Sequence, residues 1–443
     1  MKLKITILLS LLSFGLVTAQ VKQWSIEECV AYALENNLTI AQLQLQLEST
    51  RTGESDAFGN FLPSLNASSN GSWNKGSGFD QTTNERISGT FFSLNGGVSS
   101  GVTLFDGLRN VNNLQRAKLS TIANQYQLDD MKDDIVLNVA NSYLQVLSSK
   151  EALKAVELQL KIAMEDYDRT KQLVDAGVLP KGNLLELEAT IANLEQQQVS
   201  GENNVLLNRL FLAQLLQITD YENFDISDES YEVPPSAIFN YSAKEIYSKA
   251  LSYRSDIKLA ETNIEIAEKD VKIAKGALYP RLGASIGYNT SYSSFVRKLS
   301  GANFGDQLSE NDGIGYGMNL SVPIFNGFSV KNSIKRSKIN LEATKLREQQ
   351  AKLELEANVN QAYLDVRSFA KSYEAAQKTL AARKLAFDFA KERYTVELMN
   401  AFDYSQAQTR LDNAAIDVIR AKYDYIFRIK ILEIYFGLPI SLE

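Results

Sequence analysis

The side chains that usually carry enzyme chemistry are nearly absent from this sequence. None of its 443 residues is histidine, and the one cysteine is Cys29. Without histidine, His-based catalytic triads, most catalytic zinc sites and imidazole pH switches are excluded. A single cysteine forms neither an intrachain disulfide nor a cysteine-rich metal site. The chain also has no G-x-x-x-x-G-K-[ST] phosphate-binding loop. We therefore expect no enzyme activity, no cofactor and no metal.

The composition is that of a folded protein with long helices. Apolar residues form 44% of the chain and charged residues 22%. Only 7 residues are proline, and scarce proline permits long uninterrupted helices. The formal net charge of −7 argues against a nucleic-acid-binding protein.

Residues 1–19 are typical of a secretory signal peptide. Lys2 and Lys4 precede a mostly apolar stretch, and Val17-Thr18-Ala19 places small residues before Gln20. A membrane anchor is the alternative, but the apolar stretch is shorter than the roughly 20 residues that a span needs. The sequence therefore predicts an exported chain, either soluble or part of an outer-membrane β-barrel.

The chain is a tandem repeat. Ser25-Ile26-Glu27-Glu28 and Ser242-Ala243-Lys244-Glu245 are both S-x-x-E capping boxes, 217 residues apart. The first begins a helix expected from about Ser25 to Gly59. Further along, the offset becomes 220, where the segment 102–107 corresponds to 322–327. The sequence predicts a first repeat over 20–218, a linker over 219–241 and a second repeat over 242–443.

Each half contains two stretches expected to form long β-strands, at 64–79 and 89–106 and at 281–296 and 313–326. In the last stretch Tyr316, Met318 and Leu320 are apolar, whereas Gly317 and Asn319 between them are small or polar. This period of two gives a strand one apolar face and one polar face.

Two interpretations of these strands are open. One is a small half-buried sheet in a soluble protein, although the stretches exceed the usual strand length of about five or six residues. The other is a membrane sheet. Four strands are too few to close a barrel, and an open sheet in lipid leaves its backbone edges unpaired. Membrane strands would therefore have to be pooled by several chains, and the signal peptide favours this interpretation.

A long helical hairpin follows each pair of strands, over 109–217 and over 331–436. The turns, here called the hairpin tips, are expected at 176–180 and 396–400. Apolar residues such as Ile135, Val139 and Tyr143 form the narrow stripe of a coiled coil.

The order of elements, the repeat, the Ala33–Asn37 segment and the Phe-Asp/Asn-Gly junctions resemble the TolC-type outer-membrane efflux proteins, the outer membrane factor family. The resemblance implies a mainly helical fold with membrane strands: a homotrimer whose shared twelve-stranded β-barrel sits in outer-membrane lipid on an α-helical periplasmic barrel. It also implies a passive channel-tunnel for efflux or type I secretion. Its partners would be a periplasmic adaptor, also called a membrane fusion protein, and an inner-membrane transporter of RND, ABC or MFS type.

The resemblance also implies three sets of site residues. Asp403 aligns with an acidic position of the periplasmic gate, together with Gln406 and the repeat equivalents Asn183 and Glu186. Adaptor docking would use the tip residues Gly177, Val178, Leu179, Glu397, Leu398 and Met399. The helix–strand junctions would be Pro63, Pro280, Phe105, Gly107, Phe325 and Gly327.

The sequence departs from the family pattern at both tips. Glu397 stands where glycine is usual, and Pro180 stands where a small hydroxyl residue is common. Each functional assignment also has a structural alternative: the apolar tip residues could serve local packing, and Asp403 could occupy the third position of a helix that Asn400 caps.

Two other functions compete with the channel. A periplasmic adaptor also has long hairpins, but would need a domain of many short strands beside a single hairpin. An exported enzyme would need a convergent catalytic group, and the sequence offers none outside helix faces.

Overall fold

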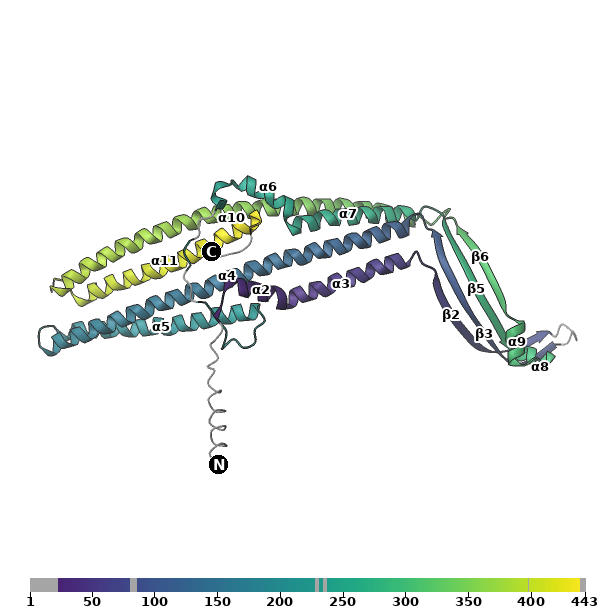
Figure 1. Ribbon diagram of the computed structural model, residues 1–443, viewed down its shortest axis with the longest axis horizontal. Coiled ribbons are helices and arrows are strands. Elements are labelled where there is room, and N and C mark those ends of the chain that lie inside the picture. The colour runs from purple at the N-terminus through teal and green to yellow at the C-terminus, as the bar shows by residue number, and fades with distance from the viewer. Residues whose placement is uncertain (1–22, 80–85, 228–230, 234–236, 397, 439–443) are drawn as a thin grey trace, which may run out of the picture. The chain divides into compact units, whose positions relative to one another are not determined.

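The computed structural model describes residues 23–79, 86–227, 231–233, 237–396 and 398–438. The predicted signal peptide lies outside these residues. The chain divides into two compact units, each formed by segments from both repeats (Figure 1). Among the described residues, no helix has the length and apolar character needed to cross a membrane.

One unit contains a four-stranded antiparallel sheet in the order β2-β3-β5-β6. Its strands lie side by side in one curved layer (Figure 1). Their bounds are Ser64–Phe79 for β2, Arg86–Phe105 for β3, Arg281–Ser293 for β5 and Gly313–Ser321 for β6.

Four strand ends differ from the sequence prediction, the smallest difference being the end of β3 at Phe105 rather than 106. β3 begins at Arg86 rather than 89, because its pairing with β2 continues to Phe79. β5 ends at Ser293 rather than 296, because the Ser293 side chain caps the short helix α8, Ser294–Ser300. β6 ends at Ser321 rather than 326: its last partner is Arg281, the first residue of β5, and Pro323 has no N–H to extend a ladder.

Helices α3 (Leu38–Gly59, from Gln44 onward), α7 (Ser255–Gly276) and the beginnings of α4 (Arg109–Asp175) and α10 (Ser329–Thr395) complete this unit. α4 and α7 approach closely at Gly107, which has φ +75°. A Cβ atom there would lie 2.2 Å from the carbonyl oxygen of Gly276, so only glycine fits. An ion pair of 2.7 Å between Arg116 and Asp270 joins the same two helices.

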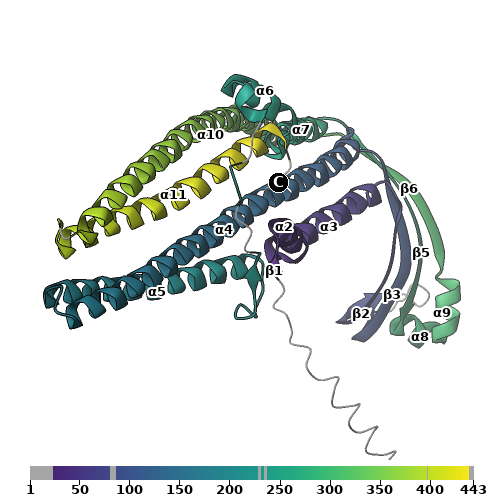
Figure 2. The ribbon, with the colours of Figure 1, turned by 60° about the vertical axis from the view of Figure 1, so that its left-hand side comes forward.

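The other unit contains the two helical hairpins. The first consists of α4 and α5 (Lys181–Leu215), and the second consists of α10 and α11 (Ala401–Phe436) (Figure 2). α11 contacts α5 and α6 (Ala243–Tyr253). The core of this unit contains fully buried side chains, among them Val139, Tyr143, Leu212, Ile426 and Ile429.

The single helix expected from about Ser25 to Gly59 is two helices. α2 (Ile26–Asn36) ends at Asn37, and α3 begins at Leu38. Asn37 has extended backbone, and its side-chain oxygen accepts from the N–H groups of Thr39 and Ile40 at 2.9 and 3.4 Å. It is therefore an N-cap inside an otherwise helical pattern. Both predicted capping boxes, at Ser25 and Ser242, are confirmed.

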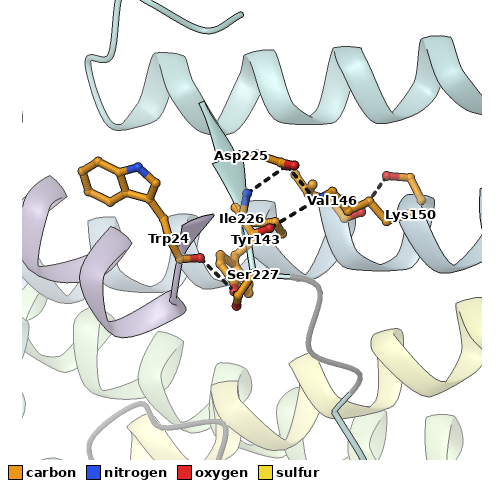
Figure 3. A network of polar contacts seen from close by, with 8 residues as sticks. Trp24, Tyr143, Val146, Lys150, Asp225, Ile226 and Ser227 are labelled. Atoms are coloured by element: carbon orange, nitrogen blue, oxygen red, sulfur yellow. Dashed lines mark hydrogen bonds and ion pairs between the residues drawn. The ribbon is translucent and has the colours of Figure 1, made fainter. Parts of the chain in front are cut away.

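Hydrogen bonds and an ion pair connect the inter-repeat linker to α4 (Figure 3). Its strand β4 (Asp225–Ile226) pairs in parallel with β1 (Gln23–Trp24), and a short 3₁₀ helix, Ala237–Asn240, follows. The Tyr143 hydroxyl donates to the Trp24 carbonyl at 3.2 Å and lies 2.9 Å from the Ser227 hydroxyl. Lys150 forms a 2.6 Å ion pair with Asp225. Burial raises the pKa of Tyr143, so it stays a neutral donor.

Candidate functional site: the sheet faces and the hairpin ends

The strand register sorts the sheet into two chemically different faces. Leu282 lies opposite Leu320, and Ile286 lies opposite Tyr316, so apolar residues share one face. This apolar face is open: Leu65 is 76% exposed and Tyr316 is 86% exposed. An exposed apolar band on strands is what a lipid-facing surface requires.

The opposite face is mostly polar and carries a charge at Arg281, which lies opposite Ser321 at the start of β5. Besides glycine, it holds mainly asparagine and serine, namely Asn66, Ser68, Asn70, Ser72, Asn74, Asn95, Ser99, Ser285, Asn289 and Asn319. In β5 from Leu282 onward, and throughout β6, no residue is charged. A sheet with one apolar and one polar face suits a water-filled barrel in lipid.

Two helices that were not predicted from the sequence contact the C-terminal end of β5. Pairing between β5 and β6 stops at Asn289, and α9 (Phe304–Glu310) contacts β5 beyond that point. The buried Gln307 side chain accepts from the Ser293 N–H at 2.9 Å, and the Thr290 hydroxyl donates to the Leu308 carbonyl at 2.7 Å. The first of these bonds satisfies a backbone N–H of β5 beyond the end of its ladder with β6. The Asn303-x-x-Asp306 capping box was the available signal.

The predicted junction residues lie where helices and strands meet. Pro63 and Pro280 directly precede β2 and β5. Gly107 and Gly327 both have positive φ, at 75° and 60°. Phe105 and Phe325 differ in exposure, at 40% and 78%, because only Phe105 is paired within the chain, with Leu282.

The first hairpin tip is a tight turn with an exposed apolar residue. Gly177 has φ +73°, and the Val178 N–H donates a hydrogen bond to the Leu173 carbonyl at 2.9 Å. Val178 is 55% exposed, and Leu179 is half-buried. Pro180 precedes α5 without a side-chain capping bond.

The second tip also has an exposed apolar residue and differs from the first in its cap. Leu398 is 69% exposed, Met399 is half-buried, and Glu397 lies outside the described residues. The Asn400 side chain accepts from the Asp403 N–H at 2.8 Å and donates to the Asp403 carboxylate at 2.9 Å. The structural role expected for Asp403 at a helix N-terminus is therefore present.

The four predicted gate residues lie near the starts of α5 and α11. Asp403 and Gln406 are exposed, and Asn183 and Glu186 are half-buried. Gln406 accepts from Arg410 at 2.8 Å. In the described part of the chain, no hydrogen bond or ion pair joins these four side chains to one another.

Polar contacts between the two hairpins lie beside these residues. The Tyr404 hydroxyl donates to Asp166 on α4 at 3.0 Å, and the hydroxyls of Ser405 on α11 and Thr190 on α5 are 2.8 Å apart. Burial and the neighbouring Asp166 raise the pKa of Tyr404, which remains a donor at neutral pH. We call these two bonds the inter-hairpin contacts. Sequence reasoning missed them because their partners are more than 200 residues apart.

A further set of contacts joins the hairpins away from the tips. Lys422 on α11 forms a 2.9 Å ion pair with Glu151 on α4, and the Tyr423 hydroxyl donates to the same carboxylate at 2.5 Å. Near the tips, the two hairpins are therefore joined by hydrogen bonds in which at most one partner is charged. Further from the tips, they are joined by an ion pair.

Comparison with known proteins identifies this arrangement. The family model described as outer membrane efflux protein matches residues 30–216 and 246–428, one segment in each repeat. The chain is 24% identical over 308 residues to the outer membrane protein TolC of Escherichia coli, which covers 68% of this chain and 60% of that protein. It is 21% identical to the outer membrane efflux protein BepC of Brucella suis, covering 80% of this chain and 74% of BepC.

Two solved structures share the fold. The channel CusC superposes with a TM-score of 0.80 at 16% identity, covering 94% of this chain and 92% of CusC. The CmeC outer membrane channel of Campylobacter jejuni superposes with a TM-score of 0.80 at 19% identity, covering 93% of this chain and 85% of CmeC.

Proposed function

The chain belongs to the outer membrane efflux protein family, and on that premise we propose that it is an outer-membrane channel-tunnel subunit. It conducts solutes passively, and an energised inner-membrane partner supplies the driving force. The helical hairpins extend into the periplasm. Relatives are named for cation efflux and for pyoverdine export, so family membership does not fix the solute.

The two-faced sheet with open edges carries this proposal. Four strands do not close a barrel, and lipid offers no partner for the backbone groups along β2 and β6. Three chains supplying four strands each would form the twelve-stranded barrel of a homotrimer. We expect the purified protein to stay in the washed membrane fraction and to have the mass of a trimer in detergent. A folded monomer that washes off the membrane would contradict the proposal.

The start of α11 is proposed as the periplasmic gate. Asp403 and Gln406, with Asn183 and Glu186 at the equivalent positions on α5, would surround the axis of the trimer. Three Asp403 carboxylates would concentrate negative potential in a narrow pore. Because Asn400 fixes the backbone around Asp403 through its capping bond, the carboxylate would have a defined position.

Conductance in a planar bilayer tests this gate. We expect a cation-selective channel that divalent ions block, and Asp403→Ala should lose both properties. If Asp403→Ala keeps the selectivity and the block but lowers stability by roughly 0.3–1 kcal/mol, Asp403 serves the helix terminus alone.

The tips are proposed as the docking site for a periplasmic adaptor, which in turn would contact a transporter of RND, ABC or MFS type. Val178 and Leu398 are exposed apolar residues at the turns, and we group them with Gly177, Leu179, Glu397 and Met399. Val178→Asp with Leu398→Asp should abolish crosslinking to the adaptor and leave the trimer intact. Unchanged crosslinking would assign these residues to local packing.

A further inference from the structure

A row of aromatic side chains crosses the sheet near α8 and α9, which lie at the end of the sheet away from α3 and α7 (Figure 1). The ring centres of Trp73 on β2 and Phe92 on β3 are 4.8 Å apart. Tyr292 on β5 lies 6.3 Å from Phe92 and 5.0 Å from Phe304 on α9. Trp73 is an even number of residues after Leu65 on β2, so both lie on the apolar face. The aromatic row therefore marks one end of the lipid-facing surface.

Strand geometry places this row at the outer boundary of a bilayer. From Leu65 to Lys75, β2 rises about 33 Å at roughly 3.3 Å per residue. With a strand tilt of about 40°, this corresponds to about 25 Å along the membrane normal, which is the height of the apolar band of an outer-membrane barrel. Phe105 marks the inner end of the band, where it lies opposite Leu282. Lipid headgroups therefore begin at the aromatic row and Lys75.

Two exposed cations lie just beyond the aromatic row. Lys75 is two residues after Trp73 on β2 and therefore lies on the same face, and the register puts Arg86 of β3 on that face as well. The Arg86 Nε donates to the Ser77 hydroxyl at 3.0 Å. This bond holds the guanidinium over β2, on the strand that carries Lys75.

The charges of the sheet are sorted by face. The four strands contain three charged residues, Lys75, Arg86 and Arg281, and all three are cations. Arg281 lies on the polar face, because the next residue, Leu282, lies on the apolar face. The charges on the apolar face of the strands are therefore positive and confined to its outer end. Long cationic side chains at that depth can reach the headgroup layer while their stems stay on apolar surface.

The second half of the chain covers the positions that are open in the first. With the offset of 217, Trp73 corresponds to Thr290 and Lys75 corresponds to Tyr292. Tyr292 is only 8% exposed and contacts Phe304, and the Thr290 hydroxyl donates to α9 at 2.7 Å. Trp73, in contrast, is 73% exposed, and Lys75 is also exposed. A segment of the chain thus occupies this position beside β5, and the equivalent position on β2 is open in the part of the chain that the structure describes.

We propose that this open surface binds a phosphate-bearing anionic lipid of the outer leaflet. The outer cationic site consists of Lys75, Ser77, Arg86, Ser88 and Thr90, all exposed on the face of the aromatic row. The acyl chains would lie against Trp73, and the phosphate would accept charge-assisted hydrogen bonds from the lysine and the arginine, with the hydroxyls as further donors.

Charge complementarity selects the anionic lipid as the occupant. Neither β2 nor β3 contains an acidic residue that could neutralise the two cations. Asp80 and Glu85, in the connection between these strands, lie outside the described residues. The lipid site deepens the proposed function, because it rests on a sheet that lies in the outer membrane.

Lipid binding to the detergent-solubilised trimer tests the outer cationic site. The probe is diphosphoryl lipid A, compared with the same lipid after both phosphates have been removed, and native mass spectrometry detects the bound lipid. We expect the parent to bind the phosphorylated form more tightly. Lys75→Gln with Arg86→Gln should weaken that binding roughly 10–30-fold and leave binding of the dephosphorylated form unchanged.

Lys118→Gln with Arg336→Gln is the matched control. It also removes one lysine and one arginine, from exposed positions on α4 and α10 outside the sheet. This variant should bind both lipid forms as the parent does, and a trimer mass in detergent shows that each double variant folds and assembles.

Equal affinity of the parent for the two lipid forms would overturn the lipid site. Unchanged affinity in Lys75→Gln with Arg86→Gln, or an equal loss in the control, would overturn it as well. Displacement of the lipid by inorganic phosphate at the same concentration would assign the cations to free phosphate and also overturn it. All of these results leave the proposed function standing if the protein is a trimer. A monomeric mass of the parent in detergent would overturn the proposed function and the lipid site together.

Discussion

The two halves of the chain share their backbone geometry and differ in side-chain chemistry. The same unusual backbone conformations recur 220 residues apart, as positive φ angles at Gly107 and Gly327, at Leu108 and Phe328, and at Gln217 and Gly437. Both β-hairpins have the same register. Near the tips, however, the second half is polar where the first is apolar or small: Tyr404 stands for Leu184, Ser405 for Leu185 and Asp412 for Ala192.

This difference shows where the two hairpins have become specialised. Turns and ladders depend on backbone angles, which many side chains tolerate, so they are retained in both halves. A contact between the two hairpins needs a hydrogen-bond donor on one hairpin and an acceptor on the other. Polar groups on α11 are therefore sufficient, and the equivalent positions of α5 need no polar counterparts. The predictions below test this division, beginning with the sheet that the halves share.

The largest effect is expected on the apolar face of the sheet. Leu320→Arg should reduce the stability of the inserted barrel by about 2–4 kcal/mol if residue 320 lies near the middle of the bilayer. Ser100, its repeat equivalent on the same face, should respond to Ser100→Arg in the same direction. The yield of folded trimer in detergent measures both.

The neighbouring Asn319 gives the control for this effect. Asn319→Arg puts the same charge one residue away on the polar face, where water solvates it, and should leave the trimer yield close to that of the parent. Equal losses from Leu320→Arg and Asn319→Arg would show that the two faces do not differ in environment.

A smaller effect on stability is expected at Asp412, whose equivalent in the first half of the chain is Ala192. Asp412 is buried, and burial raises the pKa of its carboxyl to about 6, from an ordinary value of 3.8, although Gln408 donates to it at 2.7 Å. The folded protein thus holds the proton more tightly than the unfolded chain. Asp412 lowers the free energy of unfolding progressively as pH rises from about 4 to about 6, and the loss persists above that range.

Asp412→Asn should remove that loss. We expect the variant to be more stable than the parent at pH 8, by up to about 3 kcal/mol, and equally stable at pH 4. Thermal unfolding in detergent at both pH values measures this. Asp388→Asn, at an exposed position on α10, controls for net charge. A gain that is equal at pH 4 and pH 8 would argue against a titrating carboxyl.

The smallest effect on stability is expected at the inter-hairpin contacts. Tyr404→Phe removes the bond to Asp166 and should cost about 1 kcal/mol. Because this bond joins the two hairpins, its loss should also increase conductance through the periplasmic end in a planar bilayer.

Tyr167 provides the matched control for Tyr404. Its hydroxyl donates to Glu188 at 3.1 Å, within the first hairpin. Tyr167→Phe therefore deletes the same chemical group without separating the hairpins, and its conductance should equal that of the parent. Similar conductance from both variants would place the gate elsewhere.

The sequence is a good guide wherever structure depends on local chemistry. Pro63 and Pro280 mark the starts of strands, the capping boxes mark the starts of α2 and α6, and Gly177 lies in the first turn. The break at Asn37 is missed because the residues on both sides of it continue a helical pattern. A capping asparagine there changes the backbone without changing that pattern.

Contacts between distant elements are not predictable in this way. Asp166 and Tyr404 each lie on a long helix, and which faces meet depends on how the hairpins pack. The cover over β5 is missed for a related reason: α8 and α9 are seven residues each, too short to give a clear helical period. The capping bond between Asn400 and Asp403 could be predicted from the sequence, because the two residues are only three positions apart.

The wide separation of β3 from β5 along the chain has a consequence for folding. β2 and β3 form a local hairpin that can pair as soon as residue 105 is synthesised. β3 can pair with β5 only later, because the partner of Ser93 is Ser293, 200 residues further along the chain. Contacts of such high sequence separation form slowly, and an open strand edge meanwhile invites aggregation. β2 contains no isoleucine, valine or threonine and is mostly serine, asparagine and glycine. Such a composition has a low propensity for cross-β stacking, so the edge of the hairpin along β2 resists aggregation while β3 waits for β5.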